Sequence, residues 1–255
     1  MSNVRTVSDT KRAFYGTHTR PINAIYRRVV EELMVETHLL LVNIDFAYDA
    51  IYALGVVSVY DRFMMGYQPD ADKDSIYLAI IQAVGADPNQ YRRDAEEVLA
   101  AAKNVPSVEA FKDLLTAAKD SGDGDTLKGN LHKVISNAKF KYSRLFTTGL
   151  YNIIEVIDSG VLQDKEKREA LLTEIAETLG FNSELLLKDV ELYRGNLEKM
   201  VQAQEVMKDM VAAEKKKKAK REQEKLDKAN AKAAEPSEPQ SEPTDAEESA
   251  ESAAE

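Results

Sequence analysis

Residues 21–41, PINAIYRRVVEELMVETHLLL, decide the fold class of this 255-residue chain. Apolar or small side chains recur there every three or four positions, namely Ile22, Ile25, Tyr26, Val29, Val30, Leu33, Met34, Thr37, Leu40 and Leu41. This spacing is typical of one face of an amphipathic helix. The first turn tolerates Pro21 because the first backbone N–H groups of a helix have no partner within it. We expect Thr19 or Arg20 to cap this helix, and other elements to cover its apolar face.

Helix start and stop signals continue along the chain, without an alternating strand pattern. The strongest is Asp87–Gln90, where a capping residue precedes proline at the first helical position and glutamine at the third. Residues 49–66 are apolar nearly all round, which predicts a central helix. We predict an all-α, multi-helix bundle over residues 1–182, its first helix capped by Ser8. Its helices are expected at about 8–16, 21–41, 49–66, 72–84, 88–104 and 107–120, two within 126–158, and one at 164–180.

The last predicted helix begins at Ser183 and has a different apolar period. Its apolar positions are spaced alternately four and three apart, with Gln204 as one polar interruption, which is the pattern of a coiled-coil seam. The alternative is a long helix that packs on its own bundle, because the seam is barely long enough for a coiled coil. We predict one charged helix over residues 183–232, with a seam formed by Leu186, Val190, Tyr193, Leu197, Met200, Met207 and Val211.

Charged residues replace the seam beyond residue 211. A run of four lysines could contact anionic lipid headgroups, to which each lysine contributes about 1 kcal/mol. These candidates for lipid contact are Lys215, Lys216, Lys217 and Lys218. Interleaved glutamates favour a solvated helix instead. From Glu235 onward the chain is acidic and has no large apolar side chain to bury, so we predict a disordered acidic tail over residues 233–255.

Composition and charge exclude several classes of protein. The formal net charge of −10 argues against a nucleic-acid binder. The chain has no cysteine, which excludes disulfides and thiolate metal sites and suggests a reducing compartment. Its most apolar stretch, residues 39–60, is interrupted by Asn43, Asp45 and Asp49, whereas a membrane span needs roughly 20 mostly apolar residues. Because the first ten residues, MSNVRTVSDT, resemble neither a signal nor a transit peptide, we expect no targeting segment.

The residue types that carry chemistry do not occur at catalytic or metal-binding spacings. His18, His38 and His132 each lack the second histidine or the Glu-x-x-His partner of known helical metal sites, so we expect surface or capping histidines. The loop SGDGDTLKGN, residues 121–130, fails as a calcium loop because Val134 stands where a glutamate is required. No nucleophile lies beside a base. We expect no enzyme, no cofactor and no metal.

Three stretches together identify a family. They are TVSDTKRAFYGTHTRPINAIYRRVVEELMVETHLL at 6–40, DFAYDAIYALGVVSVYDRFMMGY at 45–67, and DSIYLAIIQAVGADPNQYRRDAE at 74–96. They resemble the thylakoid formation protein family, also described as photosystem II biogenesis factor 29. The resemblance covers most of the first 100 residues closely and the next 110 in organisation. One departure lies in SVYDRF, residues 58–63, where the family pattern has a threonine and a phenylalanine.

The resemblance implies a non-enzymatic factor in thylakoid biogenesis and in photosystem II assembly or repair. It implies association with a membrane FtsH-type protease complex and with photosystem II-related membrane proteins. It also implies a peripheral location on the cytoplasmic side of the thylakoid membrane, and the missing transit peptide suggests a cyanobacterial member. The alternative function is a structural protein of the membrane surface that binds anionic lipids through its lysine-rich helix.

The family carries no catalytic motif, so a candidate partner face rests on residue types alone. Long planar donors beside aromatic rings are enriched at protein interfaces. In the alternative interpretation, Arg20 and Arg28 pair within the domain with Glu31, Glu32, or the apparently buried Asp45 and Asp61, because arginine is a common partner of partly buried carboxylates. The candidate face consists of Arg12, Tyr15, Arg20, Arg27 and Arg28.

Overall fold

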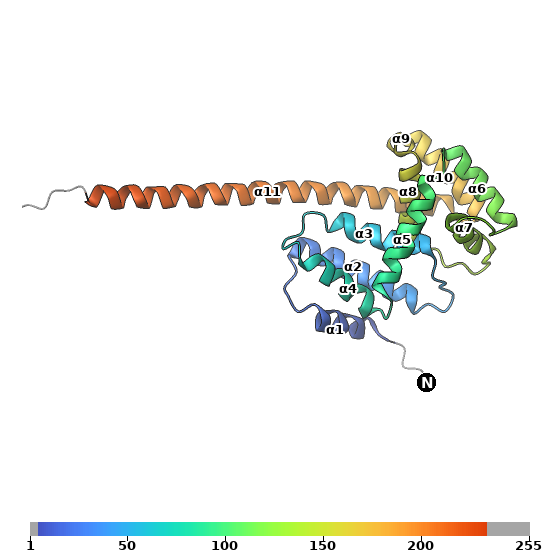
Figure 1. Cartoon of the computed structure of the whole chain (residues 1–255), viewed down its shortest axis with the longest axis horizontal. Helices are drawn as coiled ribbons and strands as arrows, with labels where there is room; N and C mark the ends of the chain where they lie inside the picture. The colour runs from blue at the N-terminus through green and yellow to red at the C-terminus, as the bar shows by residue number, and fades with distance from the viewer. Residues whose placement is uncertain (1–4, 234–255) are drawn as a thin grey trace, which may run out of the picture. The chain divides into compact units, whose positions relative to one another are not determined.

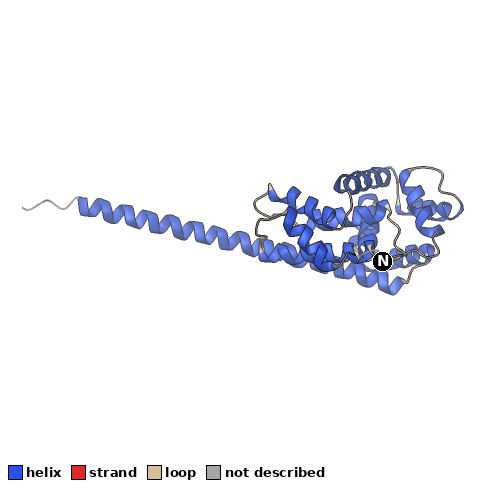
Figure 2. Cartoon of the chain, turned by 90° about the horizontal axis from the view of Figure 1, so that it is seen from below, coloured by secondary structure: helices blue, strands red, loops and turns tan. Residues whose placement is uncertain are grey.

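The computed structural model describes residues 5–233, with side chains as far as Lys225. Within these residues every regular element is an α-helix, which confirms the predicted all-α class (Figures 1 and 2). The predicted acidic tail lies outside the described residues, apart from Ala233, where the last helix ends. The helices are α1 (Val7–Thr17), α2 (Ala24–Leu41), α3 (Ala50–Phe63), α4 (Asp72–Ala83), α5 (Pro88–Lys103), α6 (Val108–Asp120), α7 (Thr126–Ser136), α8 (Arg144–Ile157), α9 (Ser159–Gln163), α10 (Lys165–Leu179) and α11 (Ser183–Ala233).

Helices α3, α5 and α8 form the centre of the bundle. Most residues of α3 and α8 are buried, as expected for helices that are apolar on nearly every side. The two helices cross where Gly55 of α3 meets the backbone of α8 and Gly149 of α8 meets the backbone of α3. A side chain at either position would overlap a carbonyl group of the other helix. The pair of glycines therefore sets how closely the two central helices approach.

Two groups of helices cover this centre. Helices α1, α2 and α4 contact one another, and α2 also packs against α3. Helices α6 and α7 pack together, and α10 contacts both α6 and α9 (Figure 1). Capping side chains fix most of the starts: Asp49, Asp87 and Ser107 each accept a backbone hydrogen bond at the predicted positions. These caps satisfy N–H groups that have no partner inside the helix.

Two predicted helix starts and one omission need correction. Thr6, rather than Ser8, caps α1, because it forms a reciprocal pair of hydrogen bonds with Asp9. Asn23, rather than Thr19 or Arg20, caps α2 by accepting a hydrogen bond from the N–H of Ile25 at 3.1 Å. The short helix α9 was not predicted, since it is a single turn capped by Asp158.

The first part of α11 belongs to the bundle core. The rings of Phe63 and Tyr151 lie 6.0 Å and 5.6 Å from the ring of Tyr193, between centroids. The predicted seam residues Leu186, Val190, Tyr193 and Met200 are buried in this core, and Leu197 packs against it. Over this part the alternative interpretation, a helix packed on its own bundle, accounts for the apolar period.

The chain divides into two compact units, one ending at Gln204 and the other beginning at Glu205. In the second unit α11 continues, with Val206, Met210 and Val211 exposed. Pairing of Met207 and Val211 with another helix stays a prediction. So do the predicted domain limits at residues 182 and 232.

Candidate functional site

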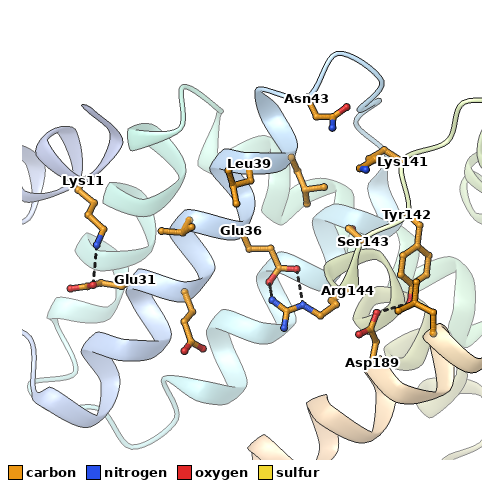
Figure 3. A pocket seen from close by; sticks show the side chains of 14 residues that line it. Lys11, Glu31, Glu36, Leu39, Asn43, Lys141, Tyr142, Ser143, Arg144 and Asp189 are labelled. Carbon is orange, nitrogen blue, oxygen red and sulfur yellow. Dashed lines mark hydrogen bonds and ion pairs between the residues drawn. The ribbon is translucent and has the colours of Figure 1, made fainter. Parts of the chain in front are cut away.

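A hollow in the first unit lies among α2, the loop before α8, and the start of α11 (Figure 3). Its volume is about 790 Å³. Helix α2 contributes one long face, because residues three and four apart lie on the same side of a helix. The lining residues are Lys11, Glu31, Glu32, Val35, Glu36, Leu39, Leu40, Asn43, Lys141, Tyr142, Ser143, Arg144, Leu185 and Asp189.

A charge pair crosses the middle of this hollow. The Arg144 guanidinium donates to the carboxylate of Glu36, with Nη2 2.9 Å from Oε2 (Figure 3). Burial raises the pKa of Glu36, and the neighbouring Asp189 and Glu32 raise it further, while Arg144 opposes the shift. Asp189 and Glu32 thus lie near the Glu36–Arg144 pair, and Glu32 itself pairs with Arg28.

Several other polar groups of the hollow make internal hydrogen bonds. The Tyr142 hydroxyl donates to Asp189 at 2.8 Å. Lys11 pairs with Glu31 at 3.2 Å. The Ser143 hydroxyl caps α8 by accepting a hydrogen bond at 3.1 Å from a backbone N–H, so it serves the helix start rather than a base. None of these contacts pairs a nucleophile with a base.

A second hollow of about 110 Å³ adjoins the first. Exposed leucines stand at the edges of the two hollows: Leu39 is 56% exposed, and Leu185 and Leu192 are each 44% exposed. The hollows form one groove between α2 and α11, because both are lined by Glu32, Glu36, Arg144 and Asp189. We call the combined hollows the α2–α11 groove.

The structure brings two of the five residues of the predicted partner face to one carboxylate. The Tyr15 hydroxyl donates to Glu31 at 3.2 Å, and Arg27 also acts electrostatically on that carboxylate. Arg12 instead pairs with Asp9 of its own helix at 3.2 Å. Partner binding by this set stays a prediction.

The other two arginines have partners within the domain. Arg28 pairs with Glu32 at 2.7 Å, as the alternative interpretation proposed, and Arg20 pairs with the buried Asp72. The sequence suggested that two further carboxylates were buried, but this was wrong. Asp61 is exposed and pairs with Arg92 at 2.8 Å, and the other exposed carboxylate is that of Asp45.

The histidines require a correction. His18 and His38 are buried rather than at the surface, and each contacts a side chain of another helix. His18 is also the C-cap residue of α1, which agrees with the capping alternative. The Nδ1 atom of His38 lies 2.9 Å from the hydroxyl of Thr10, and that of His18 lies 3.0 Å from the hydroxyl of Ser75. Within residues 5–225, no three acidic or histidine side chains are placed to hold a metal ion.

The lysine run on the second unit is accessible. Its four side chains are all exposed, namely those of Lys215, Lys216, Lys217 and Lys218. Their contact with anionic lipid headgroups stays a prediction. None of the helices that the structure describes combines the length and apolar character needed to cross a membrane.

Comparison with known proteins places this architecture in a family. The model of the thylakoid formation protein family matches residues 6–222, which include all three quoted stretches and every residue of the α2–α11 groove. The chain belongs to the thylakoid formation protein family. It is 52% identical over 218 residues to protein Thf1 of Trichormus variabilis, covering 86% of this chain and 93% of that protein. It is 51% identical over 219 residues to protein Thf1 of Crocosphaera subtropica, covering 86% and 89%.

A solved structure shares the fold of this family member. The structure of Psb29 at 1.55 Å is 40% identical in sequence and superposes with a TM-score of 0.72. The superposition covers 84% of this chain and 99% of that one. The family and the fold expected from the resemblance are therefore confirmed.

Sequence reasoning missed the groove. Its residues come from α1, α2, α3, residues 141–148 and α11, so no single motif contains them. One local signal was present: Leu39 interrupts the buried spacing of α2 and makes the helix end apolar on more than one face.

Proposed function

We propose that this chain is a non-enzymatic adaptor in thylakoid biogenesis and in photosystem II assembly or repair. In this role it associates with a membrane FtsH-type protease complex and with photosystem II-related membrane proteins. It acts as a peripheral protein on the cytoplasmic side of the thylakoid membrane. Membership of the thylakoid formation protein family over residues 6–222 supports the biological setting.

The α2–α11 groove is the observation that carries the adaptor role. Several of its polar side chains cap helices or form internal pairs, and its edges expose leucines to solvent. Catalysis requires groups poised to change protonation or to attack, whereas recognition requires apolar anchors among fixed charges. The groove has the second set of properties.

Affinity purification tests this proposal. The full chain, tagged at one end, is expressed in a cyanobacterium and recovered from gently solubilised thylakoid membranes. We expect subunits of the FtsH-type protease to be recovered in a constant ratio to the bait at increasing salt. Recovery no higher than from an untagged strain would contradict the association.

A second candidate function is direct attachment to the membrane surface through the lysine run, residues 215–218. The exposure of all four lysines favours it, because lysines near an anionic surface each contribute about 1 kcal/mol. Flotation with vesicles containing anionic lipid is compared with flotation with neutral vesicles. If replacing all four lysines by glutamine abolishes flotation but leaves protease recovery unchanged, lipid contact is an additional property and the adaptor role stands.

A further inference from the structure

The α2–α11 groove has the dimensions of a site for a short helix. Val29 and Leu39 bound it along α2, ten residues apart, and Leu185 and Asn196 bound it along α11, eleven residues apart. At 1.5 Å per residue, both edges are about 15 Å long, or about three helical turns. Leu39 and Leu185 line the larger hollow, whereas Val29 and Asn196 line the smaller one. The two edges therefore run side by side in opposite directions.

The walls of the groove decide which backbone conformation can enter. Both edges are helical between their ends, so their N–H and C=O groups are already paired within α2 and α11. An extended segment would bury its own backbone groups against these walls without partners, which is costly. A helix arrives with its backbone hydrogen bonds made and presents side chains alone. The groove thus favours a helix over a strand.

The side chains of the groove define the chemistry of that helix. Three exposed leucines, Leu39, Leu185 and Leu192, offer apolar contact along both edges. Between them lie the carboxylates of Glu32, Glu36 and Asp189. Arg144 pairs with Glu36, and Arg28 pairs with Glu32.

One of these carboxylates has no cationic partner among the described residues, and a second has a solvent-exposed one. Asp189 is 8% exposed and accepts one hydrogen bond, from Tyr142, and none of the ion pairs among the described residues includes it. Glu32 pairs only with Arg28, whose side chain is 84% exposed, and such exposed pairs contribute little. A cationic side chain that enters between the leucines would compensate the charge of Asp189 and could also contact Glu32.

We propose that the α2–α11 groove binds an amphipathic helix of a partner protein, with apolar side chains against Leu39, Leu185 and Leu192. A lysine or arginine beside the apolar stripe of that helix pairs with Glu32 and Asp189. Apolar residues at positions i, i+4, i+7 and i+11 reach both ends of a three-turn groove. This proposal extends the adaptor role, and its test uses purified components, so that its failure would leave the protease association standing.

The probe is a fluorescein-labelled peptide of about 18 residues, long enough for partial helicity in water. It consists of leucine at the four stripe positions, two lysines beside the stripe and alanine elsewhere. A matched peptide carries glutamate in place of both lysines. Binding to the purified full chain is followed by fluorescence anisotropy. We expect saturable binding of the lysine peptide, at least tenfold tighter than that of the glutamate peptide.

Substitutions in the groove separate its apolar and charged contributions. Leu39→Gln and Leu192→Gln should each weaken binding of the lysine peptide tenfold or more. Leu78→Gln is the matched control, because Leu78 is 40% exposed on α4, outside the groove lining. Glu32→Lys should weaken the lysine peptide and strengthen the glutamate peptide, an inversion that a folding defect cannot produce. Circular dichroism verifies that each variant keeps its helical content.

Several outcomes would overturn the proposal. Equal binding of the two peptides, or equal effects of Leu39→Gln and Leu78→Gln, would show that the groove does not select the helix. Sedimentation in which the chain alone dimerises and Leu39→Gln makes it monomeric would assign the groove to a second copy. Loss of vesicle flotation in Leu39→Gln, with peptide binding intact, would assign it to the lipid surface.

Discussion

Replacing Gly55 by alanine tests what holds the two central helices together. Propensity alone predicts a gain, because alanine is favoured over glycine inside a helix by about 1 kcal/mol. Packing predicts the opposite. A Cβ atom at Gly55 would lie 1.7 Å from the carbonyl oxygen of Leu145, and one at Gly149 would lie 1.9 Å from that of Ile51. Carbon and oxygen atoms in contact stand about 3.3 Å apart.

The size of the effect follows from that overlap. Neither neighbour is a flexible side chain, so α3 and α8 must separate by roughly 1.5 Å at their crossing. A gap of 0.5–1 Å already costs about a quarter to a half of each dispersion contact, and these are the most buried helices of the bundle. We expect Gly55→Ala to lower the free energy of unfolding by about 3 kcal/mol or more, at the upper end for overpacked cores. At this chain length that corresponds to a melting temperature lower by roughly 6–12 °C.

The assay is urea denaturation followed by circular dichroism, on Gly55→Ala, Gly149→Ala and a control. The control is Gly195→Ala in α11, where a Cβ atom would meet nothing within 4 Å. It keeps the propensity effect and removes the clash, so it should stabilise the protein by up to about 1 kcal/mol. If Gly55→Ala were as stable as Gly195→Ala, the close crossing of α3 and α8 would not limit stability, and the reasoning would fail.

Three further predictions concern buried charges. Burial raises the pKa of Asp49 to about 7. The free energy of unfolding should therefore fall by up to about 4 kcal/mol as pH rises from about 4 to 7, because Asp49 ionises more readily in the unfolded chain. Asp49→Asn keeps the cap and should remove this fall in pH-dependent denaturation. Arg168 is 3% exposed and donates to a backbone carbonyl and to a carboxylate. Arg168→Met should lower the free energy of unfolding by about 1–3 kcal/mol, and an unchanged midpoint of urea denaturation would contradict this. Arg20→Ala leaves the buried Asp72 without its cationic partner and should lower the free energy of unfolding by about 3 kcal/mol. Arg28→Ala breaks an exposed pair and should lower it by less than about 0.5 kcal/mol. Equal losses in the two variants would show that burial of the partner does not matter.

The starts of several helices could be predicted from the sequence because capping interactions are local. Asp49, Asp87 and Ser107 lie within three residues of the N–H groups that they satisfy, so a short window contains the whole interaction. Thr6 was missed in favour of Ser8 because two capping residues compete within one turn, and only a reciprocal hydrogen bond to the side chain at the third helical position decides between them.

The crossing of the central helices could not be predicted. Gly55 and Gly149 are distant in sequence, and neither is unusual in its own helix. Only the packed structure shows that each glycine faces the backbone of the other helix.

Burial of charged groups was the least predictable property. Asp45 and Asp61 follow apolar residues and looked buried, but both end up at the surface beside loops and helix ends. Asp49 and Asp72 look equivalent to that pair in sequence, yet they are buried in the folded protein. Whether a carboxylate is covered depends on the neighbouring helix, and the crossing angles that bring that helix there are tertiary properties.

The two faces of α2 explain why sequence reasoning found the core and missed the groove. Tyr26, Val30 and Met34 point into the bundle, while Val29 and Leu39 lie along the adjacent face that lines the groove. Because successive positions differ by about 100° around the axis, apolar residues of both faces merge into one broad stripe when the sequence is read alone. The structure separates them by exposure. Substitutions on the groove face should therefore change binding without changing folding, whereas substitutions one position away should do the reverse, and this contrast is what identifies a recognition surface built on a core helix.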